Sequence, residues 1–484
     1  MRFWRILMLT GVGLAAFAVP NLRAEERPNF VVILCDDLGW GDLASYGHPH
    51  IKTPNLDRLA VEGMRLTSFY SAAPVCSPSR VGLLTGRNPN RAGVYDWIPH
   101  VEQRNQSGKA SRALVHMRKE EVTLPQVLQK AGYATALSGK WHCNADFNTA
   151  GQPQPGEAGF DHWFATQNNA APSHENPVNY VRNGNEVGPL EGYSCQLAAR
   201  EAIDWIEALP KEKPFFLYLA FHEPHEPVAS PPELVKGYEG IARNEDEAEY
   251  FANVENMDRA VGELMATLDR LKLAENTVVV FSSDNGPETL NRYRASNRSY
   301  GTPGPLRGMK LWTTEAGCRV PGIVRWPAKI KPGQVSDEAV SSLDFLPSFA
   351  SLAGASLPEG LALDGADMMA ALNGGKVARE KPLFWIYFNA LNEQRVAMRE
   401  GDWKILAKLN GGKLPTVSNV TEGSAAKVRQ AVLTDFSLFE IAKDQGEERD
   451  LAQEQPDKLK EMQGKLEAAY RELTGSMFVW PDVD

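Results

Sequence analysis

Three continuous apolar runs along the chain each end in a cluster of polar residues. The runs cover residues 29–34, 215–221 and 277–281 and are rich in β-branched and aromatic side chains. Uninterrupted runs of this length are typical of strands that are buried on both faces. The polar clusters that follow are Cys35-Asp36-Asp37, His222-Glu-Pro-His225 and Ser282-Ser-Asp284-Asn285.

Helical patterns separate these strands, with apolar positions recurring on one face at residues 54–62, 124–131, 195–209 and 250–273. Strands that alternate with helices predict an α/β fold with a large, mostly parallel sheet between helices. Ligands of such sheets bind at the carboxyl ends of the strands. The three polar clusters therefore mark the expected position of a functional site.

The pattern changes after about residue 352. Pro, Gly and Ala become frequent up to residue 375, and short strand-like stretches follow at 382–387, 395–399 and 403–407. A helical pattern at 456–473 closes the chain. We expect a large N-terminal domain over residues 25–370 and a C-terminal subdomain over residues 371–484, with a small antiparallel sheet and one helix.

Residues 1–24 have the pattern of a secretory signal peptide. Arg2 and Arg5 precede an apolar run at 6–19, and Ala24 is the candidate residue before cleavage. The run is short for a membrane span, although an uncleaved anchor is the alternative. We expect an exported protein, periplasmic or secreted, with no stable membrane anchor.

Composition, net charge and cysteine spacing limit the classes of function that this chain can have. The chain has 484 residues, of which 43% are hydrophobic and 23% charged, so a folded protein is expected. The net charge of −10 argues against a nucleic-acid partner, and any positive pocket for an anion must be local. The five cysteines show no zinc-binding spacing, and their odd number leaves at least one outside any disulfide.

The stretch PVCSPSRVGLLTGR, residues 74–87, predicts a helix that begins near Cys76. Pro78 fits the first turn, and Gly86 can end the helix. A helix N-terminus attracts anions, and Arg80 lies one turn further on the same face as Cys76. This arrangement suits a tetrahedral oxyanion. A helix start with a buried thiol and a surface arginine explains the same residues without a site.

The same stretch, Cys76-Ser-Pro-Ser-Arg80 followed by Leu83-Leu-Thr-Gly-Arg87, resembles the signature of the type I sulfatases, in the arylsulfatase and N-acetylgalactosamine-6-sulfatase branch. Similarity extends from about residue 28 to 350 and includes further motifs at 28–42, 132–142, 214–227, 283–286 and 305–321. The sequence departs from the family at Ala316, where glycine is usual, and at Cys143-Asn144. The resemblance implies an alkaline-phosphatase-like fold.

In this family the signature cysteine is oxidised after translation to Cα-formylglycine. The resemblance implies that Cys76 is the precursor of an aldehyde and that the partner is a formylglycine-generating or sulfatase-maturating enzyme. The aldehyde hydrate has two hydroxyls, one to attack sulfur and one to lose a proton and expel sulfate. A serine would have no second hydroxyl for the last step.

Asp36, Asp37, Asp284 and Asn285 offer oxygen ligands at strand ends. Oxygen donors without Cys or His favour Ca²⁺ or Mg²⁺, although such pairs also form turns and helix caps. Ca²⁺ is the usual ion of the family. The resemblance implies one Ca²⁺, with the hydrate made from Cys76 as a further ligand.

Further roles follow from the resemblance, motif by motif. Arg80 would orient the hydrate, Lys140 would bind a sulfate oxygen, and His142 would hold and later deprotonate the hydrate. His225 and Lys310 would bind sulfate and assist protonation of the leaving group. Taken singly, the two lysines fit a solvated surface and His142 fits a buried core histidine, so only the joint pattern supports a site.

Three alternatives stay open. The superfamily includes phosphodiesterases and phosphonate hydrolases. With Cys76 unmodified, the protein would be a sulfated-glycan receptor, and a metal-stabilised structural protein is the third alternative. For the enzyme, the expected substrate is a sulfated small molecule or glycan, and our hypothesis is a sulfated-glycan exo-sulfatase. Residues 167–175 and 292–303 would line the sugar pocket, with Trp97, Trp163 or Trp312 as stacking faces.

Overall fold

The computed structural model describes residues 27–102 and 114–482. The predicted signal peptide lies outside the described residues. Within those two ranges, no helix is both long enough and apolar enough to span a bilayer.

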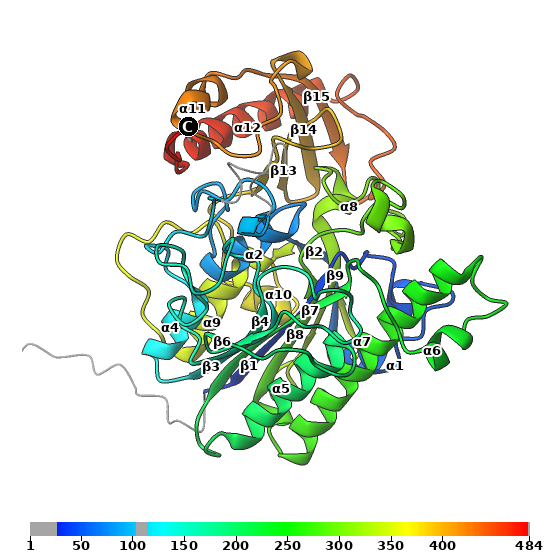
Figure 1. Cartoon of the computed structure of the whole chain (residues 1–484). Helices are drawn as coiled ribbons and strands as arrows, with labels where there is room; N and C mark the ends of the chain where they lie inside the picture. Colours follow the sequence, from blue (N-terminus) through cyan, green and yellow to red (C-terminus); the bar gives the residue numbers. More distant parts are fainter. Residues whose placement is uncertain (1–26, 103–113, 483–484) are drawn as a thin grey trace, which may run out of the picture.

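The larger part of the chain is built on an 11-stranded mixed sheet with the order β10-β2-β9-β8-β1-β7-β3-β4-β5-β6, and β11 pairs with β2 (Figure 1). The central strands β8, β1, β7, β3 and β4 run parallel, whereas β9 is antiparallel to β8 and β2. The predicted mostly parallel sheet between helices is therefore confirmed. The bounds are β1 Asn29–Asp36, β2 Met64–Tyr70, β3 Ala134–Lys140, β4 His162–Thr166, β5 Val181–Arg182, β6 Asn185–Glu186, β7 Phe215–Pro224, β8 Thr277–Ser283, β9 Arg319–Arg325, β10 Gln334–Ser336 and β11 Val340–Ser341.

The helices cover both faces of this sheet. Their bounds are α1 Pro54–Glu62, α2 Cys76–Thr85, α4 Leu124–Lys130, α5 Ser194–Ala208, α6 Pro232–Lys236, α7 Glu245–Arg270, α8 Glu315–Cys318, α9 Phe345–Ala353 and α10 Met369–Leu372. Successive residues of a strand point to opposite faces. Phe30 and Val32 of β1 accordingly face the core formed with α2, α4 and α9, while Val31 and Ile33 face the core formed with α1, α5 and α7.

Strand β1 is fully buried over its whole length, which explains why its apolar run is unbroken. β1 and β7 extend further than their apolar runs predict, so that Asp36 and His222 lie within the strands. Helix α7 begins five residues before the predicted start of its pattern, at Glu245. The side chain of Asn244 accepts a hydrogen bond from the backbone of Glu247 and caps the helix there. Three acidic residues in the first turn also stabilise this end, because negative charge interacts favourably with the helix dipole.

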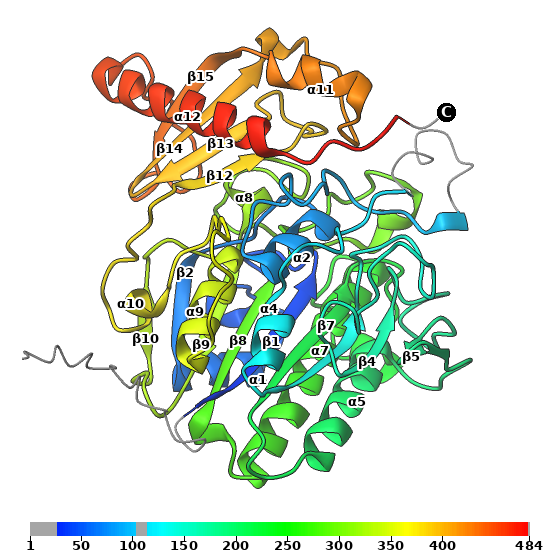
Figure 2. The same cartoon turned by 90° about the vertical axis from the view of Figure 1, so that its left-hand side faces the viewer.

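The C-terminal part of the chain forms a second sheet of four antiparallel strands in the order β12-β13-β14-β15, with α12 packed on it (Figure 2). The bounds are β12 Leu383–Ile386, β13 Val396–Glu400, β14 Trp403–Leu409, α11 Glu422–Arg429, β15 Leu433–Glu440 and α12 Pro456–Ser476. The predicted small sheet and closing helix are confirmed. The sequence pattern did not predict β15, whose alternation is interrupted at Asp435, a residue with a positive φ of 49°.

Both views place α8 at the boundary between the large sheet and the four-stranded sheet (Figures 1 and 2). α8 is followed directly by β9, and residues 305–314 precede it without a regular element. This irregular segment carries Lys310. Its position between the two sheets is important for the site described below.

Candidate active site

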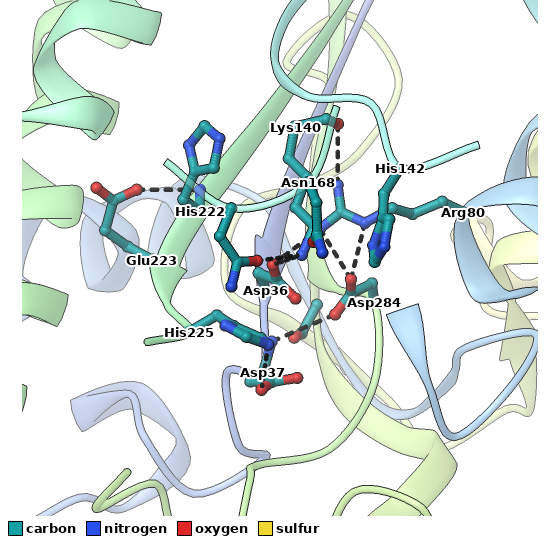
Figure 3. Close-up of polar contacts among 12 residues, drawn as sticks. Asp36, Asp37, Arg80, Lys140, His142, Asn168, His222, Glu223, His225 and Asp284 are labelled. Atoms are coloured by element: carbon teal, nitrogen blue, oxygen red, sulfur yellow. Dashed lines mark hydrogen bonds and ion pairs between the residues drawn. The ribbon is translucent and has the colours of Figure 1, made fainter. Parts of the chain in front are cut away.

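Polar side chains from four neighbouring strands meet at the carboxyl edge of the large sheet (Figure 3). Asp36 ends β1, Lys140 ends β3, and His225 and Asp284 directly follow β7 and β8. Because these strands run parallel, their ends reach the same edge. The structure therefore brings together the polar clusters that the sequence placed after separate apolar runs.

Cys76 is the first residue of α2, and Gly86 ends this helix in the left-handed conformation with a φ of 64°. The predicted helix start is thus confirmed. Cys76 is only 3% exposed and lines a cavity at the sheet edge. Burial raises the pKa of its thiol to about 12, against the lowering effect of Lys140 and Lys310. An unmodified Cys76 would be a neutral thiol and a poor nucleophile.

Arg80 is completely buried, so the alternative of a surface arginine is wrong. Its Nε and Nη2 lie 2.9 and 2.8 Å from Oδ2 of Asp284. Its Nη1 donates to the carbonyl oxygen of Lys140 at 3.1 Å, and Nη2 lies 3.7 Å from Oδ2 of Asp36. Burial alone would lower the pKa of Arg80, but Asp284 and Asp36 raise it, so the guanidinium stays charged. Through these polar contacts, Arg80 connects α2 to the ends of β1, β3 and β8.

The four Asp and Asn residues that were predicted as metal ligands lie together and are buried. Asp36 accepts a hydrogen bond from Lys140 at 2.5 Å through Oδ2, while its buried Oδ1 has no hydrogen-bond partner among the described residues. Asp37 accepts from Nδ2 of Asn285 at 2.7 Å through Oδ1, and within the same part of the chain the buried Oδ1 of Asn285 also has no partner. Unpartnered buried acceptors are costly unless a cation or donor meets them. These oxygen atoms fit a hard divalent cation.

Crowding of the carboxylates changes their pKa values. Burial, then repulsion by Asp36, raises the pKa of Asp284 to about 7, and burial raises that of Asp37 to about 6. Burial would also raise the pKa of Asp36, but Lys140, His225 and Arg80 hold it well below its usual range. Ligand atoms of Asp36, Asp37 and His225 lie within 4.8 Å of one another. His225 was predicted to bind sulfate and to assist protonation of the leaving group, and its position beside the acidic pair is an addition to that prediction.

The two predicted lysines are buried, so the alternative of solvated surface lysines is wrong for both. Nζ of Lys140 also donates to Oδ1 of Asn169 at 3.0 Å. Nζ of Lys310 lies 2.7 Å from Oδ2 of Asp37 and 3.8 Å from Glu288. Burial would lower the pKa of Lys310, but Asp37 raises it well above its usual value, so this ammonium group stays charged.

The two ring nitrogens of His142 differ in their contacts. Nε2 lies 2.9 Å from the carbonyl oxygen of Ile98, whereas the buried Nδ1 has no hydrogen-bond partner in residues 27–102 and 114–482. A carbonyl oxygen only accepts, so Nε2 carries the hydrogen and Nδ1 keeps a lone pair. Burial, with Lys140 and Arg80, lowers the pKa of His142 well below its usual value. His142 is therefore a neutral imidazole with a free basic nitrogen.

The cavity beside Cys76 has a volume of about 400 Å³. It is lined by three further predicted site residues, His142, His225 and Lys310, and by residues of the two predicted loops, Asn168, Asn169, Arg292, Tyr293 and Ala295. Trp97 also lines it, as predicted. Trp163 is buried in the hydrophobic core and is therefore wrong as a stacking face, and Trp312 is not among the residues that line this cavity. A larger cavity of about 910 Å³ beside β2 and the C-terminal subdomain contains none of these site residues.

Comparison with known proteins decides the family. The model of the family described as Sulfatase matches residues 28–355. The chain belongs to the sulfatase family. A second model, described as the C-terminal region of N-sulphoglucosamine sulphohydrolase, matches residues 309–408 of this sulfatase.

Curated relatives identify the branch. The sulfatase is 37% identical to N-acetylgalactosamine-6-sulfatase from Canis lupus familiaris, over 79% of this chain and 72% of the relative. It is 34% identical to human arylsulfatase A, over 89% of this chain and 84% of the relative. The predicted type I sulfatase of this branch is confirmed, and the protein is a sulfuric ester hydrolase.

Solved structures agree with this assignment. PsFucS1 sulfatase from Pseudoalteromonas sp. superposes with a TM-score of 0.71 at 26% identity, covering 95% of this chain and 94% of the other. A sulfatase structure from work on glycosaminoglycan metabolism in Bacteroides thetaiotaomicron gives 0.73 at 27% identity, covering 92% and 99%. The alkaline-phosphatase-like fold predicted for the sulfatase is confirmed.

Sequence reasoning missed Glu288 and Glu226, two residues of the sulfatase that line the cavity. Glu288 lies between Lys310 and Arg292, 3.8 Å from the first and 2.7 Å from the second. Glu226 contributes the carbonyl oxygen that Nδ1 of His225 contacts at 2.7 Å. Glu288 and Glu226 each stand within four residues of a predicted site residue, and this proximity was the available signal.

Proposed function

We propose that the protein hydrolyses sulfate esters of sulfated carbohydrates, using a formylglycine made from Cys76 and one bound Ca²⁺. The observation that supports this most is the placement of Cys76. It opens α2, lines the cavity with His142, His225 and Lys310, and lies at the sheet edge where the buried oxygen ligands gather. A buried thiol with a raised pKa has no evident role there unless it is modified.

Asp36, Asp37, Asp284 and Asn285, together with the side chain made from Cys76, would hold the ion. A bound Ca²⁺ would supply positive charge that lowers the pKa of a nearby hydroxyl and offsets negative charge on the sulfate group. Arg80 would hold Asp284 in place through its two contacts with Oδ2 and would stabilise the start of α2.

The charged groups of the cavity would bind and orient the sulfate ester. Lys310 stays protonated beside Asp37, so its ammonium group can bind a sulfate oxygen and supply the proton that the leaving alcohol needs. Lys140 would bind a second oxygen. Nδ1 of His225 faces a carbonyl oxygen, so it carries the hydrogen, and Nε2 is the nitrogen on the Asp37 side. In its protonated form His225 would donate from Nε2 to the ester oxygen and position that oxygen beside Lys310.

Replacing His142 with alanine is expected to lower kcat by about 10²- to 10⁴-fold, because a positioned base contributes this much. The free Nδ1 would otherwise take the proton when sulfate is released. Mass spectrometry should then find a larger fraction of the sulfated form of residue 76 during turnover. Tyr293→Phe, at the more exposed rim of the same cavity, is the control, and an equal loss there would contradict a specific role for His142.

Support for a sugar substrate comes from the cavity and from the relatives. A cavity of about 400 Å³ with amide, charged and aromatic walls has the size and polarity for one sugar unit. One relative is named for N-acetylgalactosamine 6-sulfate, and one neighbour comes from glycosaminoglycan metabolism. We propose removal of sulfate from a terminal sugar.

We also propose the processing and organisation expected from the sequence. The chain would be exported to the periplasm or secreted after cleavage of residues 1–24, and a formylglycine-generating or sulfatase-maturating enzyme would act on Cys76. Residues 25–370 would form the catalytic domain and residues 371–484 the C-terminal subdomain.

A panel of sulfated mono- and oligosaccharides tests the substrate class. Matured protein is expected to release sulfate from monosaccharides and from the ends of oligosaccharides faster than from internal positions. Ion chromatography of sulfate and mass analysis of the products measure both. Activity on aryl sulfates alone would contradict the carbohydrate assignment, and faster hydrolysis of phosphate diesters than of sulfates would contradict the proposed function itself.

A further inference from the structure

The irregular segment 305–314, which carries Lys310, is held from outside the large sheet. At its start, Nη1 of Arg307 donates to the carbonyl oxygen of Glu447 at 3.2 Å. Just after its end, the backbone N–H of Glu315 donates to Oε2 of Glu447 at 2.8 Å. Glu447 lies in the segment that connects β15 to α12 and is 2% exposed. Glu447, a single buried residue of the C-terminal part, therefore makes a hydrogen bond near each end of the segment 305–314.

Glu447 belongs to a buried cluster of charges at this boundary. Nζ of Lys404 on β14 lies 3.1 Å from Oε1 of Glu447 and 2.9 Å from Oε1 of Glu315. Oε2 of Glu315 accepts from Nη1 of Arg319 at 3.0 Å and from the hydroxyl of Tyr70 at 2.6 Å. Glu315 and Lys404 are completely buried. The removal of one partner from such a cluster leaves an uncompensated buried charge.

The same cluster reaches the segment that leads to Cys76. Tyr70 is the last residue of β2, and residues 71–75 connect it to Cys76 at the start of α2. The backbone of Ser71 donates to the carbonyl oxygen of Cys318 at 2.8 Å, and that of Leu311 donates to Pro74 at 2.9 Å. The segments that carry Cys76 and Lys310 are therefore hydrogen-bonded to each other and share one anchor.

Further hydrogen bonds also hold the segment 305–314 against the C-terminal part of the chain. The backbone of Leu391 donates to the carbonyl oxygen of Leu311 at 2.9 Å. The backbone of Thr313 donates to Oδ1 of Asn392 at 3.0 Å. Lys310 itself has one backbone hydrogen bond to the large-sheet part, to Pro287 at 2.8 Å. Leu391, Asn392 and Glu447, all beyond residue 390, therefore supply hydrogen bonds to this irregular segment.

We propose that Glu447 and Lys404 are positioning residues that set where Lys310 stands relative to residue 76. This inference rests on the proposed function, in which Lys310 binds the sulfate group. The C-terminal subdomain then completes the active site without touching the substrate. A misplacement of a binding group by about 1 Å can cost about 100-fold in rate, so the anchor is expected to matter for turnover.

The test compares Glu447→Gln with Glu448→Gln. Glu448 is the adjacent residue, of the same type, and its side chain is exposed. Glu447→Gln keeps the shape of the side chain but removes the charge that Lys404 contacts. We expect kcat/KM to fall about 10- to 100-fold and the inhibition constant of inorganic sulfate to rise, with no change for Glu448→Gln.

Amide hydrogen exchange separates positioning from general stability. In Glu447→Gln, exchange is expected to accelerate over residues 307–316 and 71–75, while β1 and β7 exchange as in the parent protein. Uniformly faster exchange, or unchanged exchange over 307–316, would overturn the proposal. If the parent protein releases no sulfate from any ester, the proposed function fails, whereas the exchange data still decide the positioning role.

Tyr70→Phe is the second variant, in case Glu447→Gln does not fold. It keeps the aromatic ring and removes only the hydroxyl that contacts Glu315. We again expect faster exchange over residues 307–316 and 71–75 and a lower kcat/KM, but both changes should be smaller than in Glu447→Gln. Combined with Glu447→Gln, it should cost less than the product of the single effects, because both changes act on one cluster. Independent, multiplicative effects would contradict a shared anchor.

Discussion

Cys76→Ala is expected to abolish sulfate release and to leave the fold intact. Alanine cannot be converted to an aldehyde, so no hydroxyl pair would exist at residue 76, and activity should fall by at least about 10³-fold. Cys76 is 3% exposed and its sulfur makes no hydrogen bond to another described residue, so loss of the sulfur should lower the free energy of unfolding by only about 1 kcal/mol. Sulfate release and thermal unfolding are the two measurements.

Cys76→Ser provides the sharper control. A serine hydroxyl could accept the sulfate group but has no second hydroxyl with which to expel it, so the variant should stop after one turnover. The peptide that contains residue 76 should then carry the added mass of one sulfate group, seen by mass spectrometry. A fully active protein whose Cys76 is an unmodified thiol would contradict the mechanism. An unmodified, inactive protein that binds sulfated glycans would favour the receptor alternative.

Removal of the proposed Ca²⁺ is expected to lower both activity and stability. Three buried aspartates meet at the site. Burial and repulsion by Asp36 disfavour the charged forms of Asp37 and Asp284 and raise their pKa values to about 6 and about 7. An ion that binds only the folded state adds about 2.7 kcal/mol to the free energy of unfolding at 100 times its dissociation constant. Treatment with a chelator should lower the Tm by several degrees, and added Ca²⁺ should restore both the Tm and the activity.

Asn285→Ala identifies the site of this effect. It removes the unpartnered buried Oδ1 without adding charge, so a higher Ca²⁺ concentration should be needed to restore the Tm. Asn389→Ala removes another amide, on the C-terminal side, whose Oδ1 has no partner among the residues that the structure describes, and it should leave the Ca²⁺ requirement unchanged. Full activity in protein that elemental analysis finds free of divalent metal would contradict the ion's role.

The sequence by itself determined the central strands of the large sheet, the start of α2 and the family of the protein. Unbroken apolar runs predicted β1, β7 and β8 because strands buried on both faces have no polar positions, and the runs ended where Asp36, His222 and Asp284 begin the polar edge. The residues around Cys76 predicted the start of α2 through local turn chemistry. The signature from Cys76 to Arg87 identified the family, which the comparisons confirmed.

Only the tertiary structure decided which residues meet. Lys140 and Lys310 look like surface lysines in the sequence but are buried against Asp36 and Asp37. Trp163 looks like a stacking face but lies in the core. Glu447, 137 positions after Lys310, shows no local pattern that ties it to that residue. Periodicity reports which side of an element is buried, whereas pairings between distant residues depend on how the elements pack, and that packing places the C-terminal part against the active site.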